Sequence, residues 1–168
     1  IEVASLKLSD MGIEFMVADA ERADLGGGFD LITANACFQW FDDLAGTLEK
    51  YKYLLNPAGT ILFSIFGPKT FRELNASLEE AFAGVSAYSA NFMAADTIKG
   101  ILNKQFRQVK TEETRYEESF SCLGELLNKI KYSGIRGEGL GAKALLTPRA
   151  LKTLEEVYLN KFKKIKAT

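Results

Sequence analysis

The 168-residue sequence contains no histidine. Histidine is the base in Ser-His-Asp and Cys-His catalysis and the commonest metal-binding side chain. Those mechanisms, histidine metal sites and histidine acid–base chemistry are therefore excluded within this chain. An enzyme made of these residues must work by binding and positioning, or with carboxylates, lysines, tyrosines or a cofactor.

Several other features are scarce. The two cysteines, Cys37 and Cys122, are isolated and lack metal-ligand spacing, which favours a reduced, cytoplasmic setting without a metal site. No run of 18 apolar residues exists, and the first residues do not resemble a signal peptide, so we expect no membrane association. A net charge of −1 does not favour nucleic-acid binding. The composition, 47% hydrophobic and 26% charged, is typical of one globular domain.

The first part of the chain has the pattern of an α/β protein. The apolar runs 13–19 and 29–34 predict buried strands, and 42–55 predicts a helix capped by Asp42 or Asp43. Residues 56–59, NPAG, are typical of a turn. The continuous apolar run 60–66 predicts a strand covered on both faces, as in a parallel sheet. Together these elements predict a strand–helix–strand crossover over Phe29–Phe66.

The second part of the chain is richer in helical patterns. Apolar spacing predicts helices over 69–83, 96–102 and 123–132, and residues 105–120 read as extended. Thr147 followed by Pro148 is a strong helix start, with Thr147 as N-cap.

Two strand ends carry candidate ligand-binding residues, because ligands of open α/β sheets bind beyond the carboxyl ends of the strands. Asp19 can accept a hydrogen bond from the exocyclic amine of an adenine, while the next backbone N–H, at Ala20, donates to a ring nitrogen. Asn35 carries both a donor and an acceptor and suits a ligand with ammonium and carboxylate groups. The alternative for each residue is an ordinary turn or helix cap.

Residues 17–67 resemble the middle of a class I S-adenosylmethionine-dependent methyltransferase. The shared pattern is a strand ending in an acid, a connector ending in FD, a strand ending near Asn, a helix, a P-x-G turn and an apolar fifth strand. A finer resemblance is to the malonyl-[acyl-carrier protein] O-methyltransferases of biotin synthesis. It rests on DAE at 19–21, N-x-x-x-Q-W at 35–40, G-P-x-T-x-x-E-L at 67–74, and the later LLNKIKYSGIRG and LTPRALKTLEEVY.

The resemblance implies one Rossmann-like methyltransferase domain over 1–168, with sheet order 3-2-1-4-5-7-6 and a helical cap. The core sheet portion would be 1–66 and 104–120, and the cap or substrate region would be 67–103 and 121–160. The family's glycine-rich loop after the first strand is not recognisable, and Gly26–Gly28 precedes a strand instead. We therefore expect the first, second and last strands to be missing, and these residues to be an inactive part of a longer chain.

By resemblance the cofactor is S-adenosyl-L-methionine. Asp19 and Ala20 would face its adenine, Asn35 its methionine part, and Phe38, Gln39 and Trp40 the transferable methyl group. For Trp40 and Phe41 the alternative is packing beneath the following helix. The substrate carboxylate would meet a cation, and the candidates are Lys69, Arg72, Lys131 and Arg136. Arginine is favoured because it can form two parallel bonds to a carboxylate, although each cation can equally be a solvated surface charge.

The implied function is methyl transfer to a carboxylate of malonyl-acyl-carrier protein, in biotin synthesis. A carboxylate is ionised near neutral pH, so no general base is needed, which agrees with the absence of histidine. The lysines at 161, 163, 164 and 166 suit an acidic carrier protein, or equally a helix C-terminus. The alternatives are a methyltransferase acting on another small molecule, and a non-catalytic methyltransferase-like binding domain.

Overall fold

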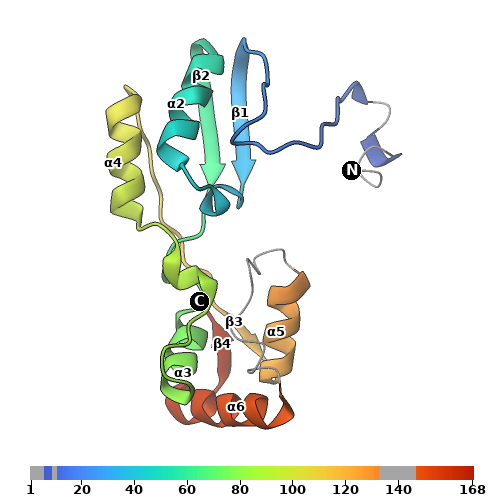
Figure 1. Ribbon diagram of the computed structural model, residues 1–168, viewed down its shortest axis with the longest axis vertical. Helices are drawn as coiled ribbons and strands as arrows, with labels where there is room; N and C mark the ends of the chain where they lie inside the picture. The colour runs from blue at the N-terminus through green and yellow to red at the C-terminus, as the bar shows by residue number, and fades with distance from the viewer. Residues whose placement is uncertain (1–5, 9–10, 133–146) are drawn as a thin grey trace. The chain divides into compact units, whose positions relative to one another are not determined.

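A computed structural model describes residues 6–8, 11–132 and 147–168 (Figure 1). The chain divides into two compact units. One comprises Ile1–Thr33 and Phe41–Leu62, and the other comprises Ala34–Trp40 and Phe63–Thr168. Among the described residues, no helix is both long enough and apolar enough to cross a membrane.

Strands β1 (Phe29–Asn35) and β2 (Leu55–Ser64) form a two-stranded sheet, and helix α2 (Leu44–Leu54) connects them. The hydrogen bonds from the Gly28 amide to the Leu54 carbonyl and from the Ala36 amide to the Ser64 carbonyl advance in the same direction on both strands. The strands are therefore parallel, as their arrows show in Figure 1, and the predicted strand–helix–strand crossover is confirmed.

Helix α2 begins where the sequence predicts. Asp43 is the N-cap, and its carboxylate accepts a hydrogen bond of 2.9 Å from the Gly46 amide. An N-cap carboxylate satisfies an amide that has no partner within the helix. The apolar side of α2 buries Leu44, Leu48 and Tyr51, as the helical spacing of these residues predicts.

The predicted turn at 56–59 is wrong, because these residues belong to β2. The side-chain Nδ2 of Asn56 donates to the Gly28 carbonyl, at 3.0 Å, and to the Asp30 carboxylate, at 2.7 Å. A Cβ atom on Gly59 would lie only 2.8 Å from the Phe29 carbonyl oxygen. The turn-like composition therefore serves close pairing with β1: the asparagine side chain bonds across the strands, and the glycine permits close approach.

The predicted buried strand at 13–19 is also wrong. These residues have no regular secondary structure, and Met16 and Val17 are 65% and 85% exposed. A strand exists only when its backbone pairs with another strand, and no described residue pairs with this segment. The predicted extended segment 105–120 is a strand only at its end, in β3 (Glu118–Phe120), because Gln105 ends helix α4 (Ala95–Gln105).

The β1–β2 sheet is not covered on both faces, contrary to the prediction from the apolar run 60–66. Exposure alternates along both strands: Leu31 and Leu62 are 54% and 64% exposed, whereas Ile32 and Ile61 are half-buried. A side chain points to the opposite face at each successive strand residue, so one face is open among the described residues. A single crossover helix can cover only one face of a sheet, which explains the difference.

The second unit contains α3 (Arg72–Ala81), α4, α5 (Leu123–Tyr132) and α6 (Pro148–Phe162), and two short 3-10 helices at Phe38–Trp40 and Tyr88–Asn91. β3 pairs antiparallel with β4 (Ile165–Ala167), and Figure 1 shows α3, α5 and α6 around this pair. Their facing sides form one apolar core, of Leu74, Leu78, Ala87, Leu123, Leu126, Leu154, Tyr158, Ile165 and Ala167. Helices α3, α5 and α6 are thus packed together with a small sheet of their own.

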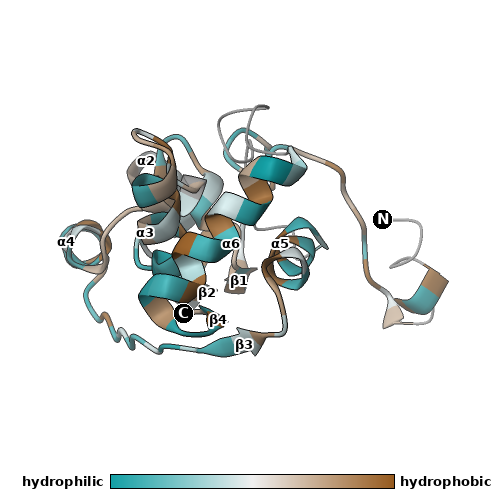
Figure 2. Cartoon of the chain, turned by 90° about the horizontal axis from the view of Figure 1, so that it is seen from below, coloured by the Kyte–Doolittle hydropathy of each residue, from teal (hydrophilic) through white to brown (hydrophobic). Residues whose placement is uncertain are grey.

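Helix α6 begins as predicted: Thr147 is its N-cap and accepts a hydrogen bond from the Ala150 amide, and Pro148 is its first residue. Hydrophobic and hydrophilic residues alternate around its surface in Figure 2. β4 is not among the predicted elements, because three residues after a lysine-rich helix end carry too little pattern. Among the described residues, β3 and β4 form a sheet separate from that of β1 and β2, and the expectation that the first, second and last strands are missing stays a prediction.

Candidate cofactor and substrate site

The carboxyl end of β1 turns sharply at Ala36. Its φ of 51° is left-handed, which costs a non-glycine residue about 1–2 kcal/mol. Ser64, the last residue of β2, holds this turn twice. The Ala36 amide lies 3.0 Å from the Ser64 carbonyl oxygen and 3.1 Å from the Ser64 hydroxyl oxygen, and it donates to both. The strained turn therefore depends on the neighbouring strand.

The same hydroxyl orients the Asn35 side chain. Ser64 Oγ already accepts from the Ala36 amide, so its single proton is free to be donated, and it goes to Asn35 Oδ1 at 2.5 Å. The carboxamide oxygen of Asn35 is thereby engaged, and its Nδ2 is the part that remains for a ligand. Asn35 and Ser64 are both exposed, on the open face of the sheet.

Gln39 has the opposite orientation. Its Nε2 donates to the Ala36 carbonyl oxygen at 2.7 Å. A carbonyl can only accept, so this bond fixes which end of the amide is which. Gln39 Oε1 is buried, and no donor among the described residues reaches it. Buried polar atoms nearly always have a partner, so this oxygen is suited to a donor group on a bound ligand.

The aromatic residues beside Gln39 pack into the protein. Phe38 is 3% exposed, and its ring centroid lies 4.9 Å from that of Phe63. Trp40 meets the buried Phe92 edge to face, with centroids 5.3 Å apart. These contacts are of the packing kind, whereas the role of Trp40 toward a substrate stays a prediction. Burial raises the pKa of the Cys37 thiol, which disfavours the nucleophilic thiolate.

Asp19 and Ala20 lie in a turn of the first unit. Asp19 Oδ1 accepts from the Glu21 amide at 3.0 Å, and Asp19 Oδ2 lies 3.5 Å from Arg22 Nε. The Ala20 carbonyl accepts from the Tyr51 hydroxyl at 2.9 Å, which ties the turn to α2. Asp19 therefore has the turn role that was the alternative for it, and its contact with adenine stays a prediction.

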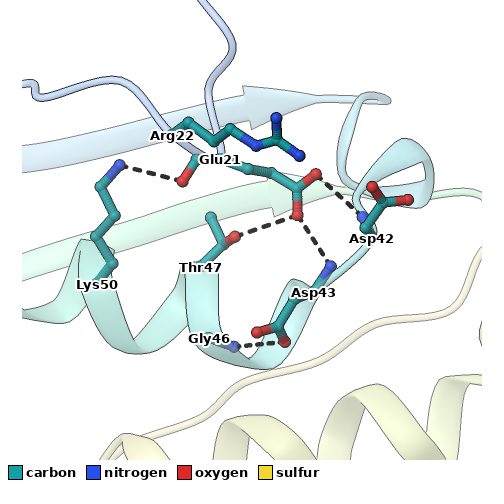
Figure 3. Close-up of a pocket in the computed structure, with 7 residues that line it drawn as sticks. All are labelled: Glu21, Arg22, Asp42, Asp43, Gly46, Thr47 and Lys50. Atoms are coloured by element: carbon teal, nitrogen blue, oxygen red, sulfur yellow. Dashed lines mark hydrogen bonds between the residues drawn. The ribbon is translucent and has the colours of Figure 1, made fainter.

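Glu21 is the residue of this turn that the sequence analysis did not single out. Its carboxylate accepts from the amides of Asp42 and Asp43, at 3.0 and 2.9 Å, just before helix α2 (Figure 3). Thr47 Oγ1 lies 3.5 Å from the same carboxylate. The signal in the sequence was Glu21, the second acid of the DAE motif at 19–21. The sequence analysis assigned only the first acid, Asp19, to a ligand.

A pocket of about 370 Å³ surrounds this carboxylate, lined by Glu21, Arg22, Asp42, Asp43, Gly46, Thr47 and Lys50 (Figure 3). Lys50 Nζ donates to the Glu21 carbonyl at 3.2 Å and to the Ala23 carbonyl at 2.5 Å. Helix N-termini favour anions, but here the anion is Glu21 itself. The polar groups of this pocket therefore bind one another and hold the 19–23 turn against the start of α2. We do not assign a ligand to the pocket.

The four candidate cations have separate surroundings. Lys69 is exposed, and Lys131 lies 5.2 Å from the ring centroid of its neighbour Tyr132. Arg72 donates through Nε to Glu73 Oε1 at 3.0 Å, while its side chain stays 46% exposed. Arg136 lies outside the described residues. Of the three candidates that the structure describes, Arg72 is thus the one with an ion pair that fixes its Nε and an exposed guanidinium.

Glu73 is buried, with 1% of its side chain exposed, and the sequence analysis did not single it out. Its carboxylate accepts from the Thr168 amide at 3.1 Å and from the Thr168 hydroxyl at 2.7 Å. Burial alone would raise the pKa of Glu73, but the hydrogen bonds from Thr168 and Arg72 together hold it below its usual value. Burial, together with the charge of Glu73, raises the pKa of Tyr158.

Three of the lysines near the C-terminus are paired with acids of this chain. Lys161 lies 2.7 Å from Glu80, and Lys164 and Lys166 lie 3.1 and 2.6 Å from Glu117. Lys161 also belongs to the last turn of α6, as the helix C-terminus interpretation requires. Such contacts favour that interpretation over a docking patch for a carrier protein.

Comparison with known proteins agrees with these motifs. Residues 1–63 match the methyltransferase domain family. The chain is 35% identical over 163 residues to malonyl-[acyl-carrier protein] O-methyltransferase 1 of Ilyobacter polytropus, which covers 96% of this chain and 60% of that protein. It is 33% identical over 139 residues to O-methyltransferase 2 of the same organism, covering 83% of this chain and 51% of that protein.

A third relative, malonyl-[acyl-carrier protein] O-methyltransferase of Acetivibrio thermocellus, is 31% identical over 173 residues, covering 94% of this chain and 61% of that protein. The chain therefore spans between 51% and 61% of the length of these curated relatives. The predicted resemblance is confirmed: residues 1–63 match a methyltransferase domain, and most of the chain is similar to malonyl-[acyl-carrier protein] O-methyltransferases.

Proposed function

We propose that the whole protein is an S-adenosylmethionine-dependent O-methyltransferase that methylates a carboxylate of malonyl-acyl-carrier protein, in biotin synthesis. The observation that carries this proposal is the pair of oriented side-chain amides at the carboxyl end of β1, those of Asn35 and Gln39. Asn35 offers a donor and Gln39 offers a buried acceptor without a donor of its own. These residues fit the carboxylate and ammonium of the methionine part of S-adenosylmethionine.

Bound S-adenosylmethionine would supply the methyl group, which a substrate carboxylate oxygen takes as its bond to sulfur breaks. The chain's own residues have a positioning task, since an ionised carboxylate needs no base to remove a proton. Asn35 and Gln39 would hold the amino-acid end of the cofactor. Asp19 and the Ala20 amide would contact its adenine, and Trp40 would lie beside the reacting carboxylate.

The substrate carboxylate would be held by cations of the cap, among Lys69, Arg72, Lys131 and Arg136. Arg72 is the first choice because its Nε is fixed by Glu73, so that the other guanidinium nitrogens keep one orientation. Arg72→Ala should raise the Michaelis constant for the acyl substrate more than it alters the affinity for the cofactor. Arg107→Ala, at an exposed arginine that is not among the candidate cations, is the matched comparison.

The test uses the whole protein with purified malonyl-acyl-carrier protein, and with free malonate as the alternative acceptor. Methyl transfer to the carrier-bound acid at a much higher kcat/KM supports the proposal. Preference for free acids would favour a methyltransferase acting on small molecules. Calorimetric binding of S-adenosylhomocysteine without transfer to either acceptor would favour a non-catalytic binding domain.

A further inference from the structure

We propose that Ser64 is a positioning residue at the carboxyl end of β1. It determines which atom each of the Asn35 and Gln39 side-chain amides presents to the cofactor, so that the two amides select a ligand carrying adjacent carboxylate and ammonium groups. The inference rests on the proposed function and deepens it: it assigns a task to Ser64 and a direction to each amide. Ser64 was not among the residues that the sequence motifs single out.

The first step is the bonding of the Ser64 hydroxyl. It accepts from the Ala36 amide at 3.1 Å and donates to Asn35 Oδ1 at 2.5 Å. A hydroxyl has one proton, so accepting from the backbone leaves that proton for Asn35 alone. The bond occupies Asn35 Oδ1 and leaves Nδ2, a donor, for the carboxylate of a ligand. Without the hydroxyl, the Asn35 amide can rotate and present its oxygen instead.

The second step is the link from Ser64 to Gln39. The Ala36 amide bonds to Ser64 through its carbonyl and hydroxyl oxygens, and the Ala36 carbonyl accepts from Gln39 Nε2 at 2.7 Å. One residue in a left-handed conformation therefore connects both amides. Gln39 Oε1 is left as a buried acceptor, which matches an ammonium group.

The third step is to distinguish a role of Ser64 in ligand binding from a role in folding stability. Asn35 and Ser64 are exposed, and an exposed hydrogen bond contributes little to folding because water replaces it. Removing the Ser64 hydroxyl should therefore change ligand discrimination more than stability. A merely structural residue would weaken all ligands of the site alike, whereas a positioning residue weakens only those with the amino-acid end.

The experiment measures binding to the whole protein by calorimetry with two probes. S-Adenosylhomocysteine carries the amino-acid end, and 5′-methylthioadenosine has the same nucleoside without it. In Ser64→Ala we expect the affinity for S-adenosylhomocysteine to fall about fivefold, which is the net effect of one hydrogen bond, while the affinity for 5′-methylthioadenosine stays unchanged. Ser64→Thr keeps a hydroxyl and should stay within about twofold of the unaltered protein for both probes.

A double-mutant cycle with Asn35→Ala tests whether Ser64 acts through Asn35. It also tests the proposal if one of the single variants is less stable than the unaltered protein. If Ser64 acts through Asn35, Ser64→Ala should have little further effect on S-adenosylhomocysteine once Asn35 is alanine. Equal weakening of both probes, or additive effects in the cycle, would overturn the role of Ser64 alone. Failure of the unaltered protein to bind either probe would overturn the proposed function and this inference with it.

Discussion

At the scale of single residues, Glu73 shows how burial and hydrogen bonding compete. Its pKa lies below the ordinary value of 4.5, because the bonds from Thr168 and Arg72 outweigh the effect of burial. A carboxyl with a lowered folded-state pKa stabilises the fold above its unfolded-state pKa, and this stabilisation is lost as the pH falls through the folded-state value. The stability of the second unit should therefore decrease below about pH 4.5.

The corresponding variant is Glu73→Gln. It removes the charge from a buried, hydrogen-bonded group, and we expect a loss of about 2 kcal/mol in unfolding free energy at pH 7. This difference should shrink as the pH falls below about 4.5, because the Glu73 carboxyl of the unfolded chain then takes up a proton while the folded-state carboxyl, with its lowered pKa, stays ionised to lower pH. Urea unfolding from pH 4 to 7 measures it. Glu79→Gln, on an exposed side of the same helix, is the control, and an equal loss in that variant would contradict the argument.

Replacing a glycine by alanine should have opposite effects at Gly59 and Gly100, because the added methyl group has different surroundings at the two positions. A Cβ on Gly59 would lie 2.8 Å from the backbone oxygen of Phe29 and 3.0 Å from the Leu55 side chain. Backbone cannot move aside as a flexible side chain can, so Gly59→Ala should destabilise the β1–β2 pairing by about 1–3 kcal/mol. Gly100 lies inside α4, where a Cβ would meet no described atom within 4 Å apart from the neighbouring backbone of its own helix, and Gly100→Ala should instead stabilise by up to about 1 kcal/mol. Denaturant unfolding of the two variants checks the opposite signs.

At the scale of elements, the contact between the 19–23 turn and α2 depends on Glu21. Two backbone amides before the helix, those of Asp42 and Asp43, have the Glu21 carboxylate as acceptor. Glu21→Ala should increase hydrogen exchange at these two amides about fivefold or more, since a lost cap costs about 1 kcal/mol. Exchange measured by NMR tests this, with Glu49→Ala on the exposed side of α2 as control. Unchanged exchange at both amides would show that water replaces the carboxylate without loss.

Helices were predicted from the sequence more reliably than strands, for a physical reason. The start of α6 is encoded locally, by Thr147 as cap and Pro148 at the first position, and the cap of α2 is likewise local. Strands depend on partners far along the chain, so the apolar run 13–19 carried no information about its lack of a partner. For the same reason NPAG was assigned as a turn, although its asparagine and glycine serve pairing with β1.

The candidate site was predictable only in its residue types. The sequence indicated that Asn35 and Gln39 are polar groups after a strand, but not how each amide is turned. That direction comes from Ser64, 29 positions after Asn35. Similarly, no local pattern could show that Glu73 would be buried against Thr168, 95 positions away. Contacts between distant residues set the chemistry of both groups, and they follow from the fold.

At the scale of the whole molecule, ligand binding and folding stability are linked. A ligand that binds only the folded protein raises the unfolding free energy by about 2.7 kcal/mol at 100 times its dissociation constant. For a protein near or above 250 residues, in which 1 kcal/mol shifts Tm by about 2 °C, this corresponds to a rise of about 5 °C in Tm. We therefore expect S-adenosylhomocysteine to raise the Tm of the whole protein by this amount.

The same linkage between binding and stability allows the affinities of two ligands to be compared through the Tm shifts that they cause. At equal concentration, 5′-methylthioadenosine should raise Tm less than S-adenosylhomocysteine, because it lacks the groups that Asn35 and Gln39 would bind. At equal multiples of their dissociation constants, the two ligands should raise Tm equally, since the stabilisation depends only on that ratio. Differential scanning calorimetry at both settings makes the comparison. Equal shifts at equal concentration would mean that the amino-acid end adds no binding energy, and that the amides after β1 face something other than the cofactor.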